Sequence, residues 1–214
     1  MSRQKLTASL AVALVALGVA AASLATAQQA AEAPSAEQMA LPAGWTMEDV
    51  QACIAAGTPG KQHAHLAANV GKWTGKCTMW MTSDSQPVTS ECTATYQPMM
   101  DGRYISADFI GEMPGMGPYH GFCVYGYDNA GGKFVASAID NHGTGIMQGT
   151  GELSEDGKTL SWKYNYTCPL TKKPTVMREI ETITGDSTKT LEMWGEDPKT
   201  GKEYKMMQIE FTKA

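Results

Sequence analysis

Two polar residues in the middle of the chain have the types and spacing of an acid–base pair. Asp140 and His142 lie two positions apart, so their side chains share one face wherever the backbone is extended. A carboxylate that orients an imidazole supports general acid–base catalysis, which would make the protein a small hydrolase or isomerase. The segment 140–143 (Asp-Asn-His-Gly) is also typical of a turn. We favour the turn as the simpler interpretation of these four residues. The nucleophile motif Gly-x-Ser-x-Gly is also absent.

Metal and haem chemistry have less support in the sequence. No pair of histidines has the helix-face spacing of a zinc protease, and no Cys-x-x-Cys occurs; the histidines are His63, His65, His120 and His142. Soft ligands suited to Cu(I) gather around two predicted loops: Met99, Met100, Met113, Met116 and His120. A haem would need an axial ligand, for which His142 is the candidate. Most other methionines fall at strand positions, as flexible core residues do, so we expect no metal and no cofactor.

A third group of residues has the character of a ligand pocket. Pockets for small molecules are mostly apolar and contain a few placed polar groups. Large aromatic side chains with one basic residue could hold an apolar molecule with an acidic head. The candidate ligand-binding residues are Trp73, Tyr96, Arg103, Tyr125, Trp162 and Tyr164, with Asp140 and His142 as further polar groups. The alternative is a filled interior in which the same aromatic rings only pack against each other.

These residues belong to a series of short alternating segments that runs from Gly71 to the C-terminus. Gly71-Lys72-Trp73 opens the series, and segments 159–166 show the clearest alternation of apolar and polar residues. Turn-rich stretches such as 128–132 separate the segments, with no helical pattern between them, which is typical of an antiparallel meander. The pattern predicts an all-β fold: a single antiparallel up-and-down β-barrel of about ten strands, of lipocalin or calycin type. Such a barrel is either filled by side chains or holds one small ligand.

The N-terminal part has a different composition. Residues 1–27 combine a basic start, a long apolar stretch and Ala25-Thr26-Ala27, which predicts a cleaved signal peptide and a periplasmic or secreted protein. Residues 28–61 are expected to form a flexible leader and a short helix, which starts at a capping box, Thr46 to Asp49, and ends at Gly57. A second short helix after Pro59 is expected to plug one end of the barrel domain, residues 62–214.

The charge of the predicted mature chain excludes some partners. Removal of the signal peptide takes away Arg3 and Lys5 and no acidic residue, so 15 Lys and Arg face 22 Asp and Glu, a formal charge of −7. Nucleic-acid binding depends on neutralising phosphates, and anionic membranes also attract basic proteins. We therefore expect no nucleic-acid partner and no stable membrane insertion.

The cysteines suggest a disulfide, because an exported chain oxidises suitable pairs. If the turn of the first hairpin centres between Asp84 and Ser85, Cys77 lies opposite Cys92, within disulfide range. A shifted turn would leave both as small core residues. Cys53 with Cys168 is a further pairing that would tie the helical extension to the barrel.

A series of ordered motifs resembles the DUF1579 family, bacterial proteins without an assigned function. The motifs extend over residues 62–213 and are His65-Leu66, Val70-Gly71-Lys72-Trp73, Gly102-Arg103, Gly111-Glu112-Met113, Gly121, Gly126-Tyr127-Asp128, Lys133 and Asp140. The resemblance implies a lipocalin-like barrel and supplies no catalytic residues that could be assigned to this chain. Gly-x-Trp alone also resembles lipocalins and nitrobindin-type haem-binding barrels.

Together these features favour an exported β-barrel that binds a small hydrophobic or amphipathic molecule without catalysis. The alternatives are a small hydrolase or isomerase that uses Asp140 and His142, and a filled barrel that acts as a structural or interaction module.

Overall fold

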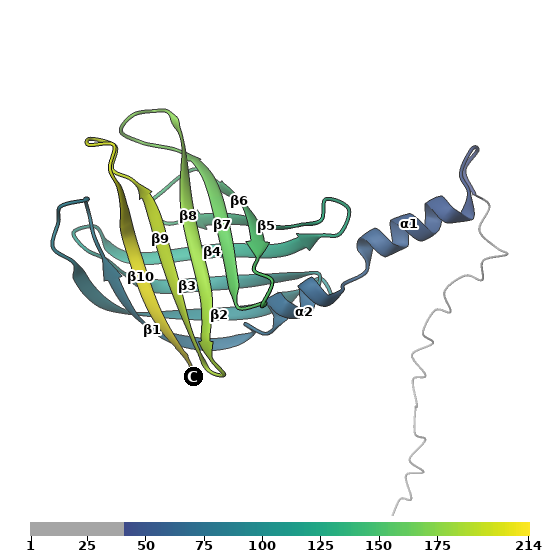
Figure 1. The fold of residues 1–214 in the computed structure, drawn as a ribbon, viewed down its shortest axis with the longest axis horizontal. Helices are drawn as coiled ribbons and strands as arrows, with labels where there is room; N and C mark the ends of the chain where they lie inside the picture. Colours follow the sequence, from purple (N-terminus) through teal and green to yellow (C-terminus); the bar gives the residue numbers. More distant parts are fainter. Residues whose placement is uncertain (1–40) are drawn as a thin grey trace, which may run out of the picture. The chain divides into compact units, whose positions relative to one another are not determined.

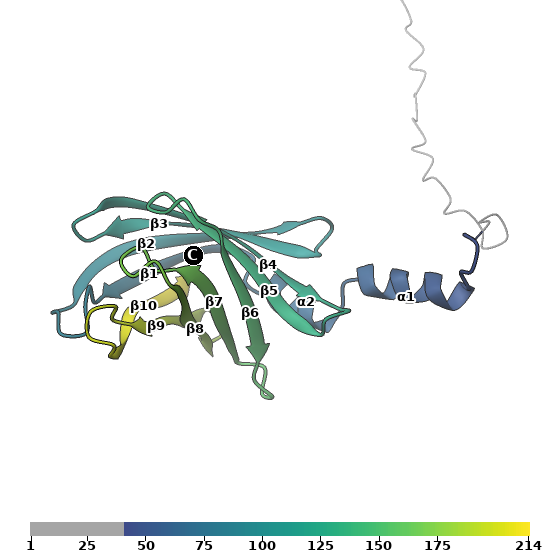
Figure 2. The same ribbon diagram turned by 90° about the horizontal axis from the view of Figure 1, so that it is seen from above.

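Ten antiparallel strands form the body of the protein. In the computed structural model, which describes residues 41–214, β1 pairs with both β2 and β10, so the sheet closes into a barrel (Figures 1 and 2). The predicted up-and-down barrel is therefore confirmed. The strands are β1 (Gly71–Met79), β2 (Val88–Met99), β3 (Tyr104–Met113), β4 (Gly117–Asp128), β5 (Lys133–Asp140), β6 (Met147–Leu153), β7 (Thr159–Thr167), β8 (Pro174–Gly185), β9 (Thr188–Glu196) and β10 (Glu203–Lys213).

The alternation of residue types decides which side chains face the interior. In β7, Leu160, Trp162 and Tyr164 are buried, whereas Ser161 and Lys163 between them are exposed. Because side chains alternate along a strand, one face of the whole sheet can bury its apolar residues inside the barrel. The strand with the best alternation in the sequence therefore has the cleanest division between inside and outside.

Two glycines of strand β6 make room for aromatic rings of the neighbouring strand β7. Gly149 pairs with Tyr164 and Gly151 pairs with Trp162 across the β6–β7 ladder. A Cβ atom added at Gly149 would lie 2.6 Å from the Tyr164 ring, and one at Gly151 would lie 2.7 Å from the Trp162 ring. The two large rings thus occupy the space above two residues without side chains. This arrangement removes the hydrophobic alternation from β6, so its sequence gives only a weak strand signal.

The first hairpin has a register different from the predicted one. Cys77 lies opposite Ser90, and Cys92 lies opposite Gly75, so the turn centres one residue earlier than expected. Both thiols face the interior, but as diagonal neighbours, whose Cβ atoms are about 7 Å apart and outside disulfide geometry. The predicted Cys77–Cys92 disulfide is therefore wrong, and both cysteines are free thiols. Cys53 and Cys168 are free as well.

Two short helices precede the barrel. Helix α1 (Met47–Gly57) begins at the predicted capping box, in which the Thr46 hydroxyl accepts from the Asp49 N–H at 3.2 Å and the Asp49 carboxylate accepts from the Thr46 N–H at 2.7 Å. Helix α2 (Lys61–Ala67) buries His63 and Leu66 at one end of the barrel, as expected. No helix among the described residues is long and apolar enough to cross a membrane. The predicted signal peptide and most of the leader lie outside the described residues.

The barrel end next to α2 is filled with side chains. Leu66 of α2 belongs to the same buried core as Trp73, Tyr96 and Trp162 from the strands. The Trp73 indole N–H donates to the carbonyl of Asn69, which follows α2, at 2.8 Å. We call this part of the interior the closed end. The helix and the Gly-x-Trp motif together seal the closed end, so any space for a ligand must lie toward the opposite end.

Candidate functional site

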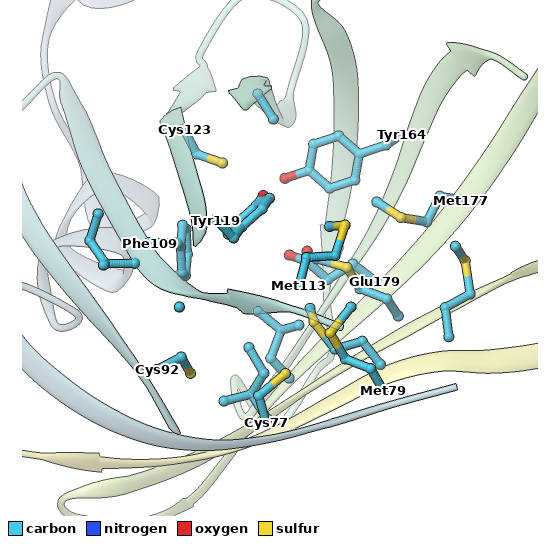
Figure 3. A pocket seen from close by; sticks show the side chains of 18 of the residues that line it. Cys77, Met79, Cys92, Phe109, Met113, Tyr119, Cys123, Tyr164, Met177 and Glu179 are labelled. Carbon is cyan, nitrogen blue, oxygen red and sulfur yellow. The ribbon is translucent and has the colours of Figure 1, made fainter. Parts of the chain in front are cut away.

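A cavity of about 210 Å³ lies inside the barrel at the end opposite the closed end (Figure 3). It is partly open to solvent, and Met113 beside the β3–β4 turn belongs to its wall. Liquid water occupies about 30 Å³ per molecule, so the volume corresponds to roughly seven waters. An apolar cavity of about 150 Å³ already holds a benzene ring, so a small organic molecule of at least one ring fits without movement of the wall.

Sulfur-containing side chains dominate the wall of this cavity. Seven of the 14 methionines of the chain and three of the five cysteines contribute to it: Met79, Met113, Met147, Met177, Met193, Met206, Met207, Cys77, Cys92 and Cys123. A β-bulge in β10 leaves Met206 without a partner in β9, so that adjacent Met206 and Met207 both reach the cavity. Methionine side chains are flexible and polarizable, so this wall can adapt to ligands of different shape.

The three thiols of the wall are unreactive at neutral pH. Burial raises the pKa of Cys77 to about 11, and burial raises the pKa of both Cys92 and Cys123 to about 12. The thiolate is the form that attacks electrophiles and binds metals. The thiols are therefore protonated at neutral pH and act as apolar wall rather than as nucleophiles or metal ligands.

Two polar groups of the wall, the Tyr164 hydroxyl and the Glu179 carboxyl, have no well-formed hydrogen bond to the protein. The Tyr164 hydroxyl is fully buried, the residue is only 2 % exposed, and the Tyr125 side chain lies near it without the geometry of a full hydrogen bond. Figure 3 shows this hydroxyl pointing into the same space as the Glu179 carboxyl and the Tyr119 side chain. Buried polar groups in folded proteins normally find a partner, and an unpaired one destabilises the fold. An unpaired hydroxyl on a cavity wall is thus a group that a ligand can satisfy.

Glu179 is the acidic group inside the cavity. The residue is 4 % exposed, and burial, followed by the nearby Glu181 carboxylate, raises its pKa to about 8, although Lys189 opposes the shift. No hydrogen bond contributes to the pKa of this carboxyl. At neutral pH Glu179 is therefore mostly protonated and neutral, which is unusual for a carboxyl group and typical of functional sites.

Lys189 belongs to the closed end and is fully engaged there. Its ammonium donates to Asn69 Oδ1 at 2.8 Å, to Tyr96 Oη at 3.1 Å and to Glu181 at 3.1 Å. It also lies 4.2 Å from the ring centroid of Tyr96 and 4.7 Å from that of Trp73. The Lys189–Glu181 pair is thus neutral as a unit, and its cation is not free to serve the cavity.

Comparison with known proteins places this architecture in a family. The family model described as "Protein of unknown function (DUF1579)" matches residues 58–213. The chain belongs to the DUF1579 family. A comparison with curated proteins finds no match.

Among solved structures, the DUF1579 barrel is similar to Rv2717c from M. tuberculosis, with a TM-score of 0.54 and 11 % identity over 73 % of this chain and 99 % of that one. It is also similar to the S-type phycobiliprotein lyase CPES from Guillardia theta, with a TM-score of 0.50 and 9 % identity over 73 % of this chain and 98 % of that one. At these identities the similarity concerns the barrel fold alone.

The structure divides the predicted ligand-binding aromatics between the two ends of the DUF1579 barrel. Tyr125 and Tyr164 line the cavity. Trp73, Tyr96 and Trp162 are buried among the side chains of the closed end, where they leave almost no free space. Both earlier alternatives thus apply to this interior, because one end is filled and the other is hollow.

The three predicted polar site residues, Arg103, Asp140 and His142, do not line this cavity. Arg103 sits in the β2–β3 turn and donates to the carbonyl oxygens of Gly57 at 3.1 Å and Met100 at 3.2 Å. Asp140 accepts from the backbone N–H of His142 at 2.8 Å, so its carboxylate stabilises a turn rather than orienting the imidazole. The His142 ring instead stacks on Tyr119 and contacts the carbonyl oxygen of Pro118 at 3.0 Å. The acid–base pair required by the enzyme hypothesis is therefore not formed.

The residues whose types would suit Cu(I) are separated as well. Met99 and Met100 lie at the start of the β2–β3 turn, whereas Met113 and Met116 lie at the β3–β4 turn, at opposite ends of the ten-residue strand β3. Of this group only Met113 reaches the cavity. Within residues 41–214, no three His, Cys, Asp or Glu side chains gather as a metal site would require.

Sequence reasoning missed the most distinctive residue of the cavity, Glu179. The inward face of β8 carries Met177, Glu179 and Glu181, while the outward face carries Arg178 and Ile180. Charged and apolar residues occur on both faces, so alternation does not reveal which one is inside. The sequence offers one indication. Glu179 and Glu181 lie two positions apart, so both acidic side chains lie on the same face of the strand.

Proposed function

We propose that this DUF1579 protein is an exported, non-catalytic binding protein for a small apolar or amphipathic molecule. The observation that carries the proposal is the buried Tyr164 hydroxyl, without a well-formed hydrogen bond, on the wall of a mostly apolar cavity. A ligand with an apolar body and one polar group would fill the space and give this hydroxyl a partner. The sealed closed end and the solvent-exposed opposite end allow entry from one side only.

The absence of a catalytic arrangement on the cavity wall favours binding over an enzyme. The wall combines protonated thiols, thioethers and phenols with a single buried carboxyl, Glu179. General acid–base catalysis is most efficient when the pKa of the acting group lies near the operating pH. The raised pKa values of the thiols and phenols of the wall move these groups away from neutral pH, which leaves Glu179 without a second group suited to proton transfer in the described part of the cavity.

Native mass spectrometry of the protein purified from its own compartment tests the proposal. We expect the mature chain to begin at Gln28, and we expect a small extra mass that is lost on denaturation. A neutral, one-ring fluorescent probe should then bind to the ligand-free protein. Ala138, which lines the cavity, offers a blocking variant: Ala138→Phe should abolish binding of the probe.

The exposed Gln148 on β6 provides the matched control, since Gln148→Phe adds the same ring on the outer face. This control should bind the probe as the wild type does. Thermal melts establish that both variants are folded. Equal probe affinity of the wild type and a folded Ala138→Phe variant would refute the cavity as the binding site.

A further inference from the structure

We infer that the cavity selects a small apolar molecule that carries a positive charge, such as a primary amine, with Glu179 as its counter-ion. The inference deepens the proposed function and rests on it. It assigns a charge class to the ligand, and it replaces the acidic head group that Arg103 would have held.

The buried charges of the barrel balance each other except at Glu179. Lys189 and Glu181 form an ion pair at 3.1 Å, with side-chain exposures of 1 % and 12 %, and Asn69 and Tyr96 complete the hydrogen bonds of the lysine. These charges cancel. Among the described residues, the other buried acid, Asp197, is held by hydrogen bonds from Ser83, Lys199 and Thr200, whereas the carboxylate of Glu179 would have no cation of its own. A bound cation would restore neutrality, whereas a bound anion would add a second uncompensated negative charge.

The cavity wall is acidic and contains no basic residue. It contains two acidic residues, Glu179 inside and Glu112 at the exposed rim, and no lysine, arginine or histidine. Two charged groups influence Glu179: Glu181, which raises its pKa, and Lys189, which lowers it, and these two pair with each other. The other titratable groups that interact with Glu179 have raised pKa values and stay neutral: Tyr96, Tyr119, Tyr125, Tyr164 and Cys123. The potential in the cavity is therefore negative once Glu179 ionises, and nothing in the wall attracts an anion.

The rest of the cavity wall is rich in aromatic rings and thioether sulfurs. Four aromatic rings surround the space near Glu179, from Phe109, Tyr119, Tyr125 and Tyr164. Aromatic faces and polarizable thioether sulfurs interact well with the hydrophobic body of an amine and with its charge. The Tyr164 hydroxyl can accept a hydrogen bond from an ammonium group while Glu179 accepts another. Both unpaired polar groups are thus satisfied by one cationic head.

Proton linkage makes the inference measurable. In the free protein Glu179 holds a proton, so binding of an ammonium ion to the carboxylate releases that proton to solvent. An alkyl ammonium stays charged from pH 6 to pH 8, as a lysine does. Because the pKa of Glu179 is about 8, its ionised fraction rises from about 1 % at pH 6 to about half at pH 8. The affinity for an amine should therefore increase about fifty-fold over this range.

The test uses three one-ring probes of nearly equal size: 2-phenylethylamine, 2-phenylethanol and phenylacetate. Their dissociation constants are measured by calorimetry at pH 6, 7 and 8. We expect the amine to bind most tightly at pH 8 and phenylacetate to bind least. The amine should gain about fifty-fold from pH 6 to pH 8, and the alcohol should show no gain over the same interval.

Two variants connect the result to the residue. Glu179→Gln keeps the shape of the side chain and should remove both the preference for the amine and its pH dependence, while the alcohol still binds. Glu112→Gln, at the exposed rim, is the matched control and should keep both. An amine affinity that is flat between pH 6 and pH 8, or no tighter than that of the alcohol, overturns the inference and leaves the proposed function intact. No binding of any of the three probes overturns both.

Discussion

The substitution Glu179→Gln should make the protein more stable at neutral pH, although it removes a charged residue type from the interior. Most substitutions of buried residues destabilise a fold, so the direction of this effect is informative. The reason lies in the raised pKa of Glu179, which is about 8 in the folded protein against 4.5 for an ordinary glutamate. Glutamine has the same shape and never ionises, so the variant loses only the ionisation equilibrium.

The sign follows from proton uptake. Below pH 4.5 the carboxyl is protonated in both states and does not affect the free energy of unfolding. Between pH 4.5 and pH 8 the folded chain keeps a proton that the unfolded chain releases, so the free energy of unfolding falls as the pH rises. One pKa unit corresponds to about 1.4 kcal/mol, so the loss is about 3 kcal/mol at pH 7 and approaches about 5 kcal/mol above pH 8. Glu179→Gln should recover an amount of this order.

Urea unfolding of the ligand-free protein at pH 5, 6, 7 and 8 measures the effect. The difference between Glu179→Gln and the wild type should be small at pH 5 and should grow with each step in pH. Glu181→Gln is the control from the same face of β8. It should destabilise the fold at every pH, because it leaves Lys189 buried with one partner fewer. A wild type and Glu179→Gln variant with parallel pH profiles would refute the assignment of Glu179 as a buried, neutral acid.

Three further results are expected. Gly149→Ala should weaken binding of a cavity probe, because the added Cβ would displace the Tyr164 ring. Gly151→Ala should instead displace the Trp162 ring of the closed end and lower stability by about 1–3 kcal/mol, with the probe affinity unchanged. A comparable loss of affinity in both variants would contradict the division into a closed and an open end. Cys77→Ser should lower the number of thiols titrated in denaturant without reductant by one, and an increase by one would reveal a Cys77–Cys92 disulfide. Arg103→Ala should leave probe affinity unchanged and cost at most about 1 kcal/mol of stability, because its two bonds are exposed, and a tenfold loss of affinity would return Arg103 to the site.

Short-range sequence patterns were sufficient to predict the barrel. The alternation in β7 and the capping box of α1 are patterns in which each residue's place depends on near neighbours. The same holds for the Gly-x-Trp motif, whose tryptophan closes the barrel next to α2. These elements are specified by short stretches of chain, and a short stretch is what a sequence pattern describes.

The site depends on distances that a pattern does not contain. A turn centred one residue earlier moves Cys92 from a position opposite Cys77 to a diagonal one, so a small error in one loop removes a disulfide. Met99 and Met113 look close in sequence, but a strand of ten residues separates their turns. Arg103 is polar and near a strand start, yet its guanidinium finds carbonyl oxygens outside the barrel. Each case turns on tertiary geometry rather than on residue type.

The two acids of β8 show why the open end is the better candidate for function. Glu181 and Glu179 lie two residues apart on the same face, and the barrel supplies a lysine, an amide and a phenol around the first site but no partner for the second. A glutamine or a leucine at position 179 would avoid a loss of several kcal/mol at neutral pH, a large part of the stability of an ordinary domain. In a filled structural barrel, an unpaired acid at this position would only lower stability. In a barrel that binds a cationic ligand, the same acid would pair with the ligand's positive charge and would select for it.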